Sequence, residues 1–319
     1  MTAPGIDPQG VGSGAVPDAA IHTEALTKRY GRLAALAGLT MTVPRGEVFG
    51  FLGPNGAGKP TAVKLLLGLA QPTAGQAWLL GSPLGDREAR RRVGYLPELF
   101  RYQDWLKARE VLQLHCELMG LPRTRWRAEI DAALDTVGLV ARADHQVRQF
   151  SKGMQQRLGL GVALLGSPDL VVLDEPTSAL DPIGRADVRQ VIRNLKQRGA
   201  TVFLNSHLLS EVEQVCDRVA VLDHGRVIAI GSLDDLIGGA TTARLRVTQL
   251  TSVAEQELRR YGAVTVEADW YTFATVAAAE VPSLVEEVIR LGGRVHAVEQ
   301  RRRSLEDRFL QLLDGGGEP

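Results

Sequence analysis

The chain has few cysteines, and they stand far apart. Cys116 and Cys216 are the only two among 319 residues, and they form no CxxC pair. His115 precedes Cys116, but neighbouring residues of a helix do not share a face. The cysteine content therefore predicts a reducing cytosol and two inert thiols that pack within helices.

Net charge and long apolar runs are absent as well. Lys and Arg together number 37, as do Asp and Glu, so no basic field exists that would hold nucleic acid at physiological salt. No run approaches the ~18 apolar residues that span a bilayer, and the N-terminus has no basic segment followed by an apolar one. We expect no direct nucleic-acid binding and a chain that is neither secreted nor self-inserting. At a membrane, another subunit would have to supply the membrane part.

The chain does have enough apolar sequence for a full core. With 45% hydrophobic and 23% charged residues, its length suffices for one large domain and a smaller one. Residues 1–20 are rich in Gly, Pro and Ala and are predicted to be a disordered tail, so order is expected to begin near Ile21.

A small β-layer is predicted at the start of the large domain. Residues 21–26, 33–43 and 47–52 have the pattern of strands, with breaks at 28–31 and 44–46. The last of these strands leads directly into a glycine-rich loop.

This loop lies between the apolar strand 48–52 and a predicted helix that begins at Thr61. Glycines let the backbone turn consecutive N–H groups inward at a helix N-terminus, which makes an anion cradle. Lys59 would add a point charge on the outer phosphates. The pattern GxxxxGK, normally followed by Ser or Thr, is that of a nucleotide-binding P-loop. The residues expected to contact the nucleotide here are Gly53, Pro54, Asn55, Gly56, Ala57, Gly58, Lys59, Pro60 and Thr61.

Pro60 departs from the P-loop pattern. It stands where Ser or Thr normally supplies the hydroxyl that ligates Mg²⁺, and it also lacks the N–H that would point at the phosphates. Thr61 is one position late. Taken alone, a glycine-rich turn without this hydroxyl is also compatible with a purely structural loop.

Polar residues also stand at the ends of two later elements. The apolar run 170–173 predicts a buried parallel strand, and it ends at Asp174 and Glu175, where α/β sheets bind ligands. Ser151 and Gly153 open a helix N-terminus, which is rich in N–H donors, although such a pair is usually only an N-cap. Helical spacing of apolar residues over 105–140 predicts a compact helical lobe. The alternation of strands and helices predicts an α/β P-loop fold with an antiparallel β-layer.

With these residues in view, the chain resembles the nucleotide-binding subunit of an ABC transporter over about residues 21–236, with a helical subdomain at about 99–165. The run Ser151, Lys152, Gly153, Met154 and Gln155 is similar to the signature of that family. Phe150 before it resembles an export-type subgroup that includes antibiotic-resistance and sodium-extrusion ATPases. Several such motifs agree in order and spacing, which a structural loop alone does not explain.

The resemblance implies roles for individual residues. Asp174 matches the carboxylate on Mg²⁺, and Glu98 stands where the family usually has a Gln that contacts the metal and the membrane subunit. Glu175 matches the base that activates the attacking water, and His207 the switch histidine that senses the γ-phosphate. Together with Lys59, these last two are the expected catalytic residues.

The remaining matches concern nucleotide contacts. Tyr30 matches an aromatic that stacks on adenine, although it is equally an aromatic that ends a strand. Asp181 closes a segment that resembles the D-loop. In this family, the signature of one subunit covers the nucleotide held by the P-loop of the other, so the resemblance implies a dimer.

A different pattern occupies residues 241–319. Strand and helix periodicities follow one another in the order βαββαβ, which predicts a ferredoxin-like α+β unit. Ser304 and Asp307 then cap a final amphipathic helix, 305–313. No catalytic constellation occurs here, so the segment is predicted to be an accessory domain for dimerisation or regulation.

We therefore expect the ATP-binding subunit of an exporter, which uses ATP and Mg²⁺ as a homodimer at the cytoplasmic face of a membrane and drives a separate permease. One alternative is a soluble ABC ATPase of DNA repair or translation, although those relatives usually carry a long insertion or two cassettes. Another is a hydrolysis-impaired cassette, because Pro60 replaces the Mg²⁺-ligating hydroxyl. The membrane partner would select the transported substrate.

Overall fold

The computed structural model describes residues 19–178, 180–237, 241–262, 264–276, 278–302 and 304–314. The predicted disordered tail lies outside these ranges, apart from Ala19 and Ala20, which are buried in the first strand. Within these ranges no helix combines the length and the apolar content needed to cross a bilayer.

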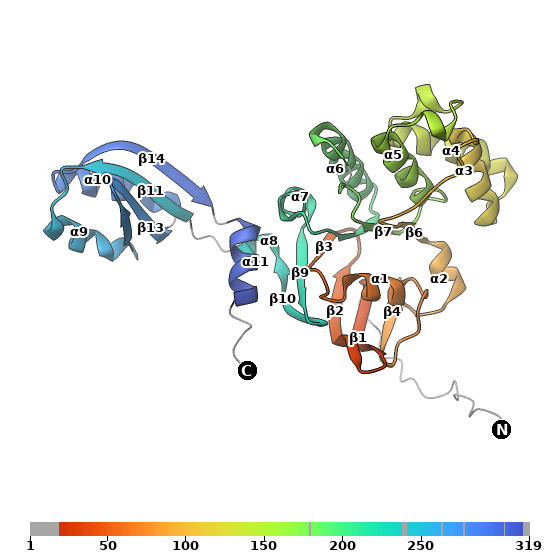
Figure 1. Ribbon diagram of the computed structural model, residues 1–319, viewed down its shortest axis with the longest axis horizontal. Helices are drawn as coiled ribbons and strands as arrows, with labels where there is room; N and C mark the ends of the chain where they lie inside the picture. The colour runs from red at the N-terminus through yellow and green to blue at the C-terminus, as the bar shows by residue number, and fades with distance from the viewer. Residues whose placement is uncertain are drawn as a thin grey trace.

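A six-stranded sheet forms the middle layer of the large domain (Figure 1). Its neighbours pair parallel except for the antiparallel edge strand β10. The strands in spatial order are β10 (Arg226–Ser232), β9 (Arg218–Asp223), β3 (Val48–Leu52), β8 (Thr201–Asn205), β7 (Leu170–Asp174) and β6 (Val93–Leu96). Because both faces are covered, the central strands read as continuous apolar runs. The order places β8 between the strand that feeds the glycine-rich loop and the strand that ends in Asp174.

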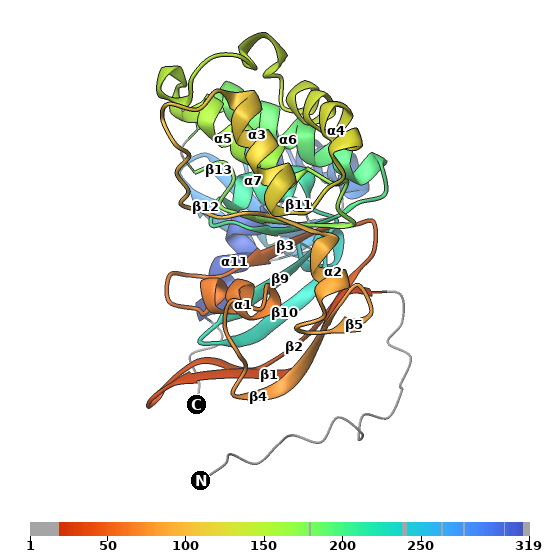
Figure 2. The ribbon, with the colours of Figure 1, turned by 90° about the vertical axis from the view of Figure 1, so that its right-hand side faces the viewer.

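An antiparallel sheet and two helices cover one face of the central sheet (Figure 2). The strands are β2 (Leu33–Pro44), β1 (Ala19–Tyr30), β4 (Ala74–Leu79) and β5 (Ser82–Pro83), and the helices are α1 (Lys59–Leu66) and α2 (Arg87–Arg91). Phe49 of β3 and Phe203 of β8 belong to the core between this layer and the central sheet, and their ring centres are 6.1 Å apart.

The break predicted at residues 28–31 starts too early, since the turn between the first two strands lies at Gly31 and Arg32. β1 runs through residues 28–30, because Lys28, Arg29 and Tyr30 pair with residues of β2 across the hairpin. Cross-strand pairing overrides the local run of polar residues.

Helices cover the opposite face and bury the second layer of core side chains (Figures 1 and 2). They are α3 (Ala108–Leu118), α4 (Arg123–Thr136), α5 (Lys152–Ala163), α6 (Pro182–Gln197) and α7 (Leu209–Val215), with short turns at Val140–Arg142 and Val147–Gln149. Since α3, α4 and α5 contact one another, they form a compact lobe. The α/β fold with an antiparallel β-layer is confirmed.

The C-terminal part is a second unit with its own sheet and core. It follows α8 (Leu233–Ile237), and its strands in spatial order are β12 (Val264–Glu267), β13 (Trp270–Val276), β11 (Thr241–Thr248) and β14 (Arg294–Arg302). The helices are α9 (Ser252–Leu258) and α10 (Val281–Arg290), with short turns at Arg259–Tyr261 and Ala278–Glu280. All strand pairs are antiparallel, and the chain follows the predicted order βαββαβ.

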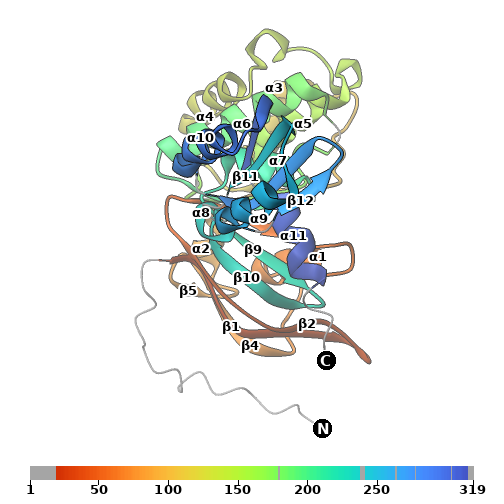
Figure 3. The same cartoon turned by 90° about the vertical axis from the view of Figure 1, so that its left-hand side faces the viewer.

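The last helix, α11 (Leu305–Asp314), returns to the large domain (Figures 1 and 3). It contacts α7 and α8, and Leu305 is 1% exposed within the core beneath α7. The backbone N–H of Leu305 also donates to Glu213 Oε2 at 3.5 Å. The sequence grouped this helix with the accessory unit, whereas its apolar side is buried against the large domain.

Candidate functional site

The glycine-rich loop connects β3 to α1 as a tight backbone cradle. Gly53 and Gly58 have φ angles of 159° and 105°, which favour glycine. A Cβ added at Gly53 would lie 2.3 Å from the carbonyl oxygen of Leu222, and one at Gly58 would lie 2.3 Å from that of Ala35. Side chains are therefore excluded from both positions, and Gly58 is the N-cap of α1 with no side-chain cap. Free N–H groups at this helix start suit a phosphate.

Lys59 begins α1 and folds back over the loop. Its Nζ donates to the carbonyl oxygens of Gly53 at 2.6 Å and Pro54 at 3.1 Å. Burial lowers the pKa of Lys59, while Glu175, Asp174 and Glu98 oppose this shift by their charge. The ammonium group of Lys59 therefore interacts electrostatically with these carboxylates, and it lies at the floor of the cradle.

Pro60 occupies the first turn of α1 and is exposed. Proline fits there because the first N–H groups of a helix have no helical partner. The helix forms as predicted, but the exposed side chain at this position offers no oxygen.

Asp174 is the last residue of β7, Glu175 follows it directly, and both are buried. Asp174 Oδ1 accepts a hydrogen bond from Asn205 Nδ2 at 2.5 Å. Burial raises the pKa of Asp174, and the hydrogen bond from Asn205 opposes the rise. The sequence did not single out Asn205, since its contact depends on β8 lying beside β7.

Glu175 and His207 form a direct pair. His207 Nδ1 donates to Glu175 Oε2 at 2.7 Å, so the imidazole holds the buried carboxylate in place. Burial raises the pKa of Glu175, and the hydrogen bond and charge of His207 oppose this rise. Glu175 also has a φ angle of 51°, a left-handed conformation that costs about 1 kcal/mol for a non-glycine residue. Strain of this kind at a strand end is typical of functional sites.

A cavity of about 220 Å³ lies between the loop and the residues after β8. Residues of the loop and His207 line it together. Phe309 of α11 also lines it, a contact that no local sequence pattern indicates. The lining residues are Gly53, Pro54, Asn55, Ser206, His207, Leu209 and Phe309.

The signature-like segment lies elsewhere, at the start of α5. Ser151 is the N-cap, and its Oγ accepts from the N–H of Met154 at 3.2 Å. Asp181 is the N-cap of α6, and its Oδ1 accepts from the N–H of Gly184 at 2.7 Å. Both caps, with Lys152, line a cavity of about 350 Å³ that has no lining residue in common with the loop cavity. One chain therefore carries two separate groups of predicted nucleotide contacts.

The other residues of this segment are Gly153, Met154 and Gln155. All three are partly exposed, and the first two line the same cavity. Gln155 Nε2 instead donates to the carbonyl oxygen of Phe150 at 3.4 Å.

Tyr30 ends β1 and is 50% exposed, with Lys28 Nζ 5.1 Å from the centre of its ring. Thr61 is partly exposed in the first turn of α1. Neither lines the two cavities described above.

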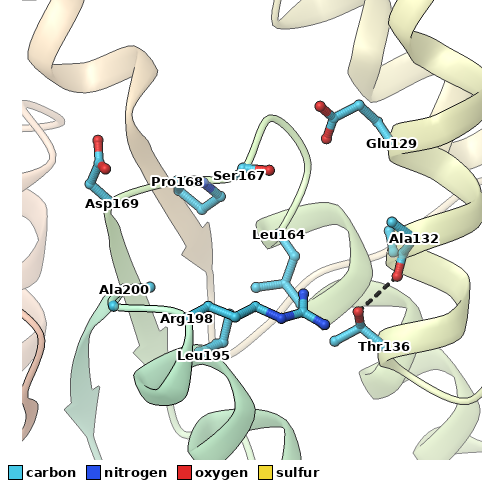
Figure 4. Close-up of a pocket in the computed structure, with 12 residues that line it drawn as sticks. Glu129, Ala132, Thr136, Leu164, Ser167, Pro168, Asp169, Leu195, Arg198 and Ala200 are labelled. Atoms are coloured by element: carbon cyan, nitrogen blue, oxygen red, sulfur yellow. Dashed lines mark hydrogen bonds between the residues drawn. The ribbon is translucent and has the colours of Figure 1, made fainter.

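A third cavity, of about 190 Å³, lies between α4, the turn before β7 and the end of α6 (Figure 4). Figure 4 shows Arg198 extending toward Thr136, whose hydroxyl donates to the carbonyl oxygen of Ala132 at 2.7 Å. None of the predicted site residues lines this cavity.

The donor set at the loop fits Mg²⁺ bound with phosphates, apart from one ligand. Asp174 supplies a carboxylate oxygen next to the loop, and the side-chain oxygen Oδ1 of Asn205 is buried without a hydrogen-bond partner. Among the described residues, no three His, Cys, Asp or Glu side chains gather to hold a metal by themselves. Proteins usually hold Mg²⁺ through one or two carboxylates together with phosphates and waters, and Asp174 is one such carboxylate. Pro60 leaves the usual hydroxyl ligand missing.

Comparisons with known proteins point the same way. A model of the ABC transporter family matches residues 36–178. An uncharacterized ABC transporter ATP-binding protein of Nostoc sp. is 42% identical over 292 residues, which cover 88% of this chain and 84% of that protein. The bacitracin transport ATP-binding protein BcrA of Bacillus licheniformis is 34% identical, covering 93% of this chain and 98% of BcrA. A dimeric ATP-binding cassette bound to ADP and Pi superposes with a TM-score of 0.60 at 26% identity, covering 67% of this chain and 98% of that one.

Proposed function

This chain belongs to the family of ABC transporter ATP-binding proteins, and we propose that it hydrolyses MgATP as a dimer to drive export through a separate membrane permease. The observation that carries the hydrolysis is the hydrogen bond between buried Glu175 and exposed His207, which lines the loop cavity. The proposed base Glu175, its partner His207 and the proposed phosphate cradle then lie together at one edge of the central sheet.

The proposed chemistry is an in-line attack of water on the γ-phosphate, in which the bond from the γ-phosphorus to the bridging oxygen breaks and ADP leaves. Glu175 takes the proton from the water, and the raised pKa of this carboxyl makes it a better base than an exposed glutamate. His207 fixes the carboxylate and reaches toward the γ-phosphate. The loop N–H groups and Lys59 hold the phosphates, because positioning and charge neutralisation supply most of the catalysis in phosphoryl transfer. Mg²⁺, held by Asp174 with Glu98 close by, would neutralise charge between the β- and γ-phosphates.

The dimer is proposed because the two groups of contacts lie in separate cavities. In a dimer, the segment from Ser151 to Gln155 and Asp181 of one chain would close over the nucleotide in the loop of the other. The similarity to a cassette whose solved form is a dimer with ADP and Pi supports this arrangement. A homodimer is the simplest case.

The contact with the permease is proposed for the surface that follows β6. Leu99 is 87% exposed and Trp105 is 69% exposed, and both come soon after Glu98. Two large apolar side chains on one loop favour a protein partner. The similarity to a Nod factor export ATP-binding protein supports export as the direction, with the chain at the cytoplasmic face of the membrane.

A second candidate function is a cassette that binds nucleotide but scarcely hydrolyses it. Pro60 favours this candidate, since it removes both the hydroxyl and the N–H at the position next to the phosphates. Such a subunit would work beside an active partner.

Glu175→Gln tests the hydrolysis. The amide keeps the shape of the side chain but does not take a proton, so turnover should fall by at least about a hundredfold while ATP still binds. Glu88→Gln, on the exposed surface of α2, is the matched control and should retain the wild-type rate. Steady-state phosphate release and binding of labelled ATP give the two readings. A Glu175→Gln protein with the wild-type rate would show that another group is the base.

Purification from the native membrane tests the partner. We expect a polytopic membrane protein to co-purify with the wild type, and less of it with a variant that carries both Leu99→Ser and Trp105→Ser. Recovery with ribosomes or DNA would contradict the transporter assignment and favour the soluble alternative.

A further inference from the structure

Asn205 is a buried polar residue whose hydrogen bonds are only half satisfied. The residue is 2% exposed, and its Nδ2 donates to Asp174 Oδ1 at 2.5 Å. Its Oδ1 is buried with no hydrogen-bond partner. An unpaired buried acceptor is costly, so such an atom calls for an explanation.

The direction of the amide is fixed by its neighbour. An ionised carboxylate only accepts hydrogen bonds, so the NH₂ group must face Asp174 and the carbonyl oxygen must face away from it. The amide therefore has one oxygen left for a donor that the protein itself does not provide.

The position of Asn205 in the sheet indicates what this donor could be. Asn205 is the last residue of β8 and pairs in register with Asp174 on one side and with Phe51 on the other. The chain beyond Phe51 continues into the phosphate cradle. The free oxygen thus belongs to the strand between the cradle and the carboxylate expected on Mg²⁺.

The same edge of the central sheet lacks one of the oxygen ligands that the family pattern provides for Mg²⁺. Pro60 stands in the first turn of α1, where the family pattern supplies a hydroxyl ligand. Mg²⁺ keeps several of its waters when it binds to proteins, so a missing ligand is readily replaced by a water that needs an acceptor to hold it.

We propose that Asn205 is a positioning residue for the metal. Its NH₂ group orients Asp174, and its free carbonyl oxygen accepts a hydrogen bond from a water in the Mg²⁺ shell. This hydrogen bond helps to fix the position of the metal. A hydroxyl at position 60, which Pro60 lacks, would otherwise do so. The inference rests on the proposed binding of MgATP.

Asn205→Leu tests the proposal, because leucine has a similar volume and no polar atom. The readout is the affinity for a fluorescent ATP analogue, measured in Mg²⁺ and again in EDTA. Mg²⁺ should raise the affinity of the wild type for the analogue. In the variant this increase should be about tenfold smaller, as is usual when a partner of a metal ligand is removed. The affinity in EDTA should stay as in the wild type.

Two further variants complete the design. Thr201→Val, at the opposite end of the same strand, removes a buried hydroxyl that accepts from the N–H of Gly46 and should leave the gain from Mg²⁺ intact. Asn205→Ala also removes both polar atoms and is smaller than leucine. It should show the same Mg²⁺-specific loss and takes the place of the leucine variant if that variant does not fold.

A double-mutant cycle links Asn205 to the missing hydroxyl. In a Pro60→Ser background the restored hydroxyl orders the metal, so Asn205→Leu should cost about threefold or less instead of tenfold. Additive effects of the two substitutions would contradict the compensation.

The outcomes separate this inference from the proposed function. A wild-type protein with no gain in affinity from Mg²⁺ would overturn both. Two results would overturn the inference alone, given a wild type whose affinity rises with Mg²⁺. In one, Mg²⁺ raises the affinity of Asn205→Leu as much as that of the wild type. In the other, Asn205→Leu lowers the affinity by the same factor in Mg²⁺ and in EDTA.

Discussion

Substitution of Pro60 by serine should raise the rate of ATP hydrolysis. The change restores a hydroxyl and an N–H in the first turn of α1, next to Lys59. Since Pro60 is exposed, the new side chain has room and disturbs no packing. The restored hydroxyl would bind Mg²⁺ directly and place it more exactly between the β- and γ-phosphates.

We expect the Mg²⁺-dependent rate to increase about tenfold or more, which corresponds to at least ~1.4 kcal/mol of barrier. Affinity for ATP should change less, because the loop and Lys59 already form the cradle. The folded state should become slightly less stable, by about 0.4–1 kcal/mol, since proline at a compatible position restricts the unfolded chain. Rate and stability therefore move in opposite directions.

Pro60→Ala separates the two restored groups. Alanine returns the N–H without the hydroxyl, so it should remain near the wild-type rate if the hydroxyl is the limiting group. The assay is steady-state phosphate release across a Mg²⁺ titration for all three proteins. Equal rates at every Mg²⁺ concentration would refute the reasoning, and an equal gain in both variants would assign the effect to the N–H.

Two other expectations follow from buried groups. Leu305→Ala should lower the free energy of unfolding by about 2–5 kcal/mol in urea titrations, because Leu305 is packed beneath α7, whereas Leu310→Ala at a 54% exposed position should cost less than about 0.5 kcal/mol. Burial raises the pKa of Glu175, so this base is protonated at a higher pH than an ordinary carboxylate. When the pH is lowered, the rate of hydrolysis should therefore begin to fall at a correspondingly higher pH. In His207→Ala the opposing hydrogen bond is lost, so this acid limb should move to still higher pH in single-turnover profiles, and an unchanged limb would contradict the role of the pair.

Local sequence patterns sufficed for the parts of the site that are contiguous. The loop from Gly53 to Lys59 is recognisable from consecutive residues, and the apolar run before Asp174 predicts a strand that ends at the carboxyl edge of the sheet. The alternation of strands and helices gave the α/β class for the same reason.

Contacts between distant segments could not be predicted in this way. The bond from Asn205 to Asp174 exists because β8 lies beside β7, and strand order is not readable from either strand alone. Phe309 reaches the loop cavity only because α11 docks on α7 and α8. The break predicted at residues 28–31 begins only at Gly31, since pairing with β2 continues through Tyr30.

The central claim is that one nucleotide is held by the loop of one chain and the signature-like segment of another. Asn55→Cys and Lys152→Cys place thiols on two exposed positions of these segments, in separate chains with different tags. The native cysteines are buried and burial raises the pKa of both thiols, so they should not compete. In a Glu175→Gln background with MgATP, we predict a disulfide between the two differently tagged chains, and little of it without nucleotide. ATP bound at full occupancy with no such disulfide would contradict the claim.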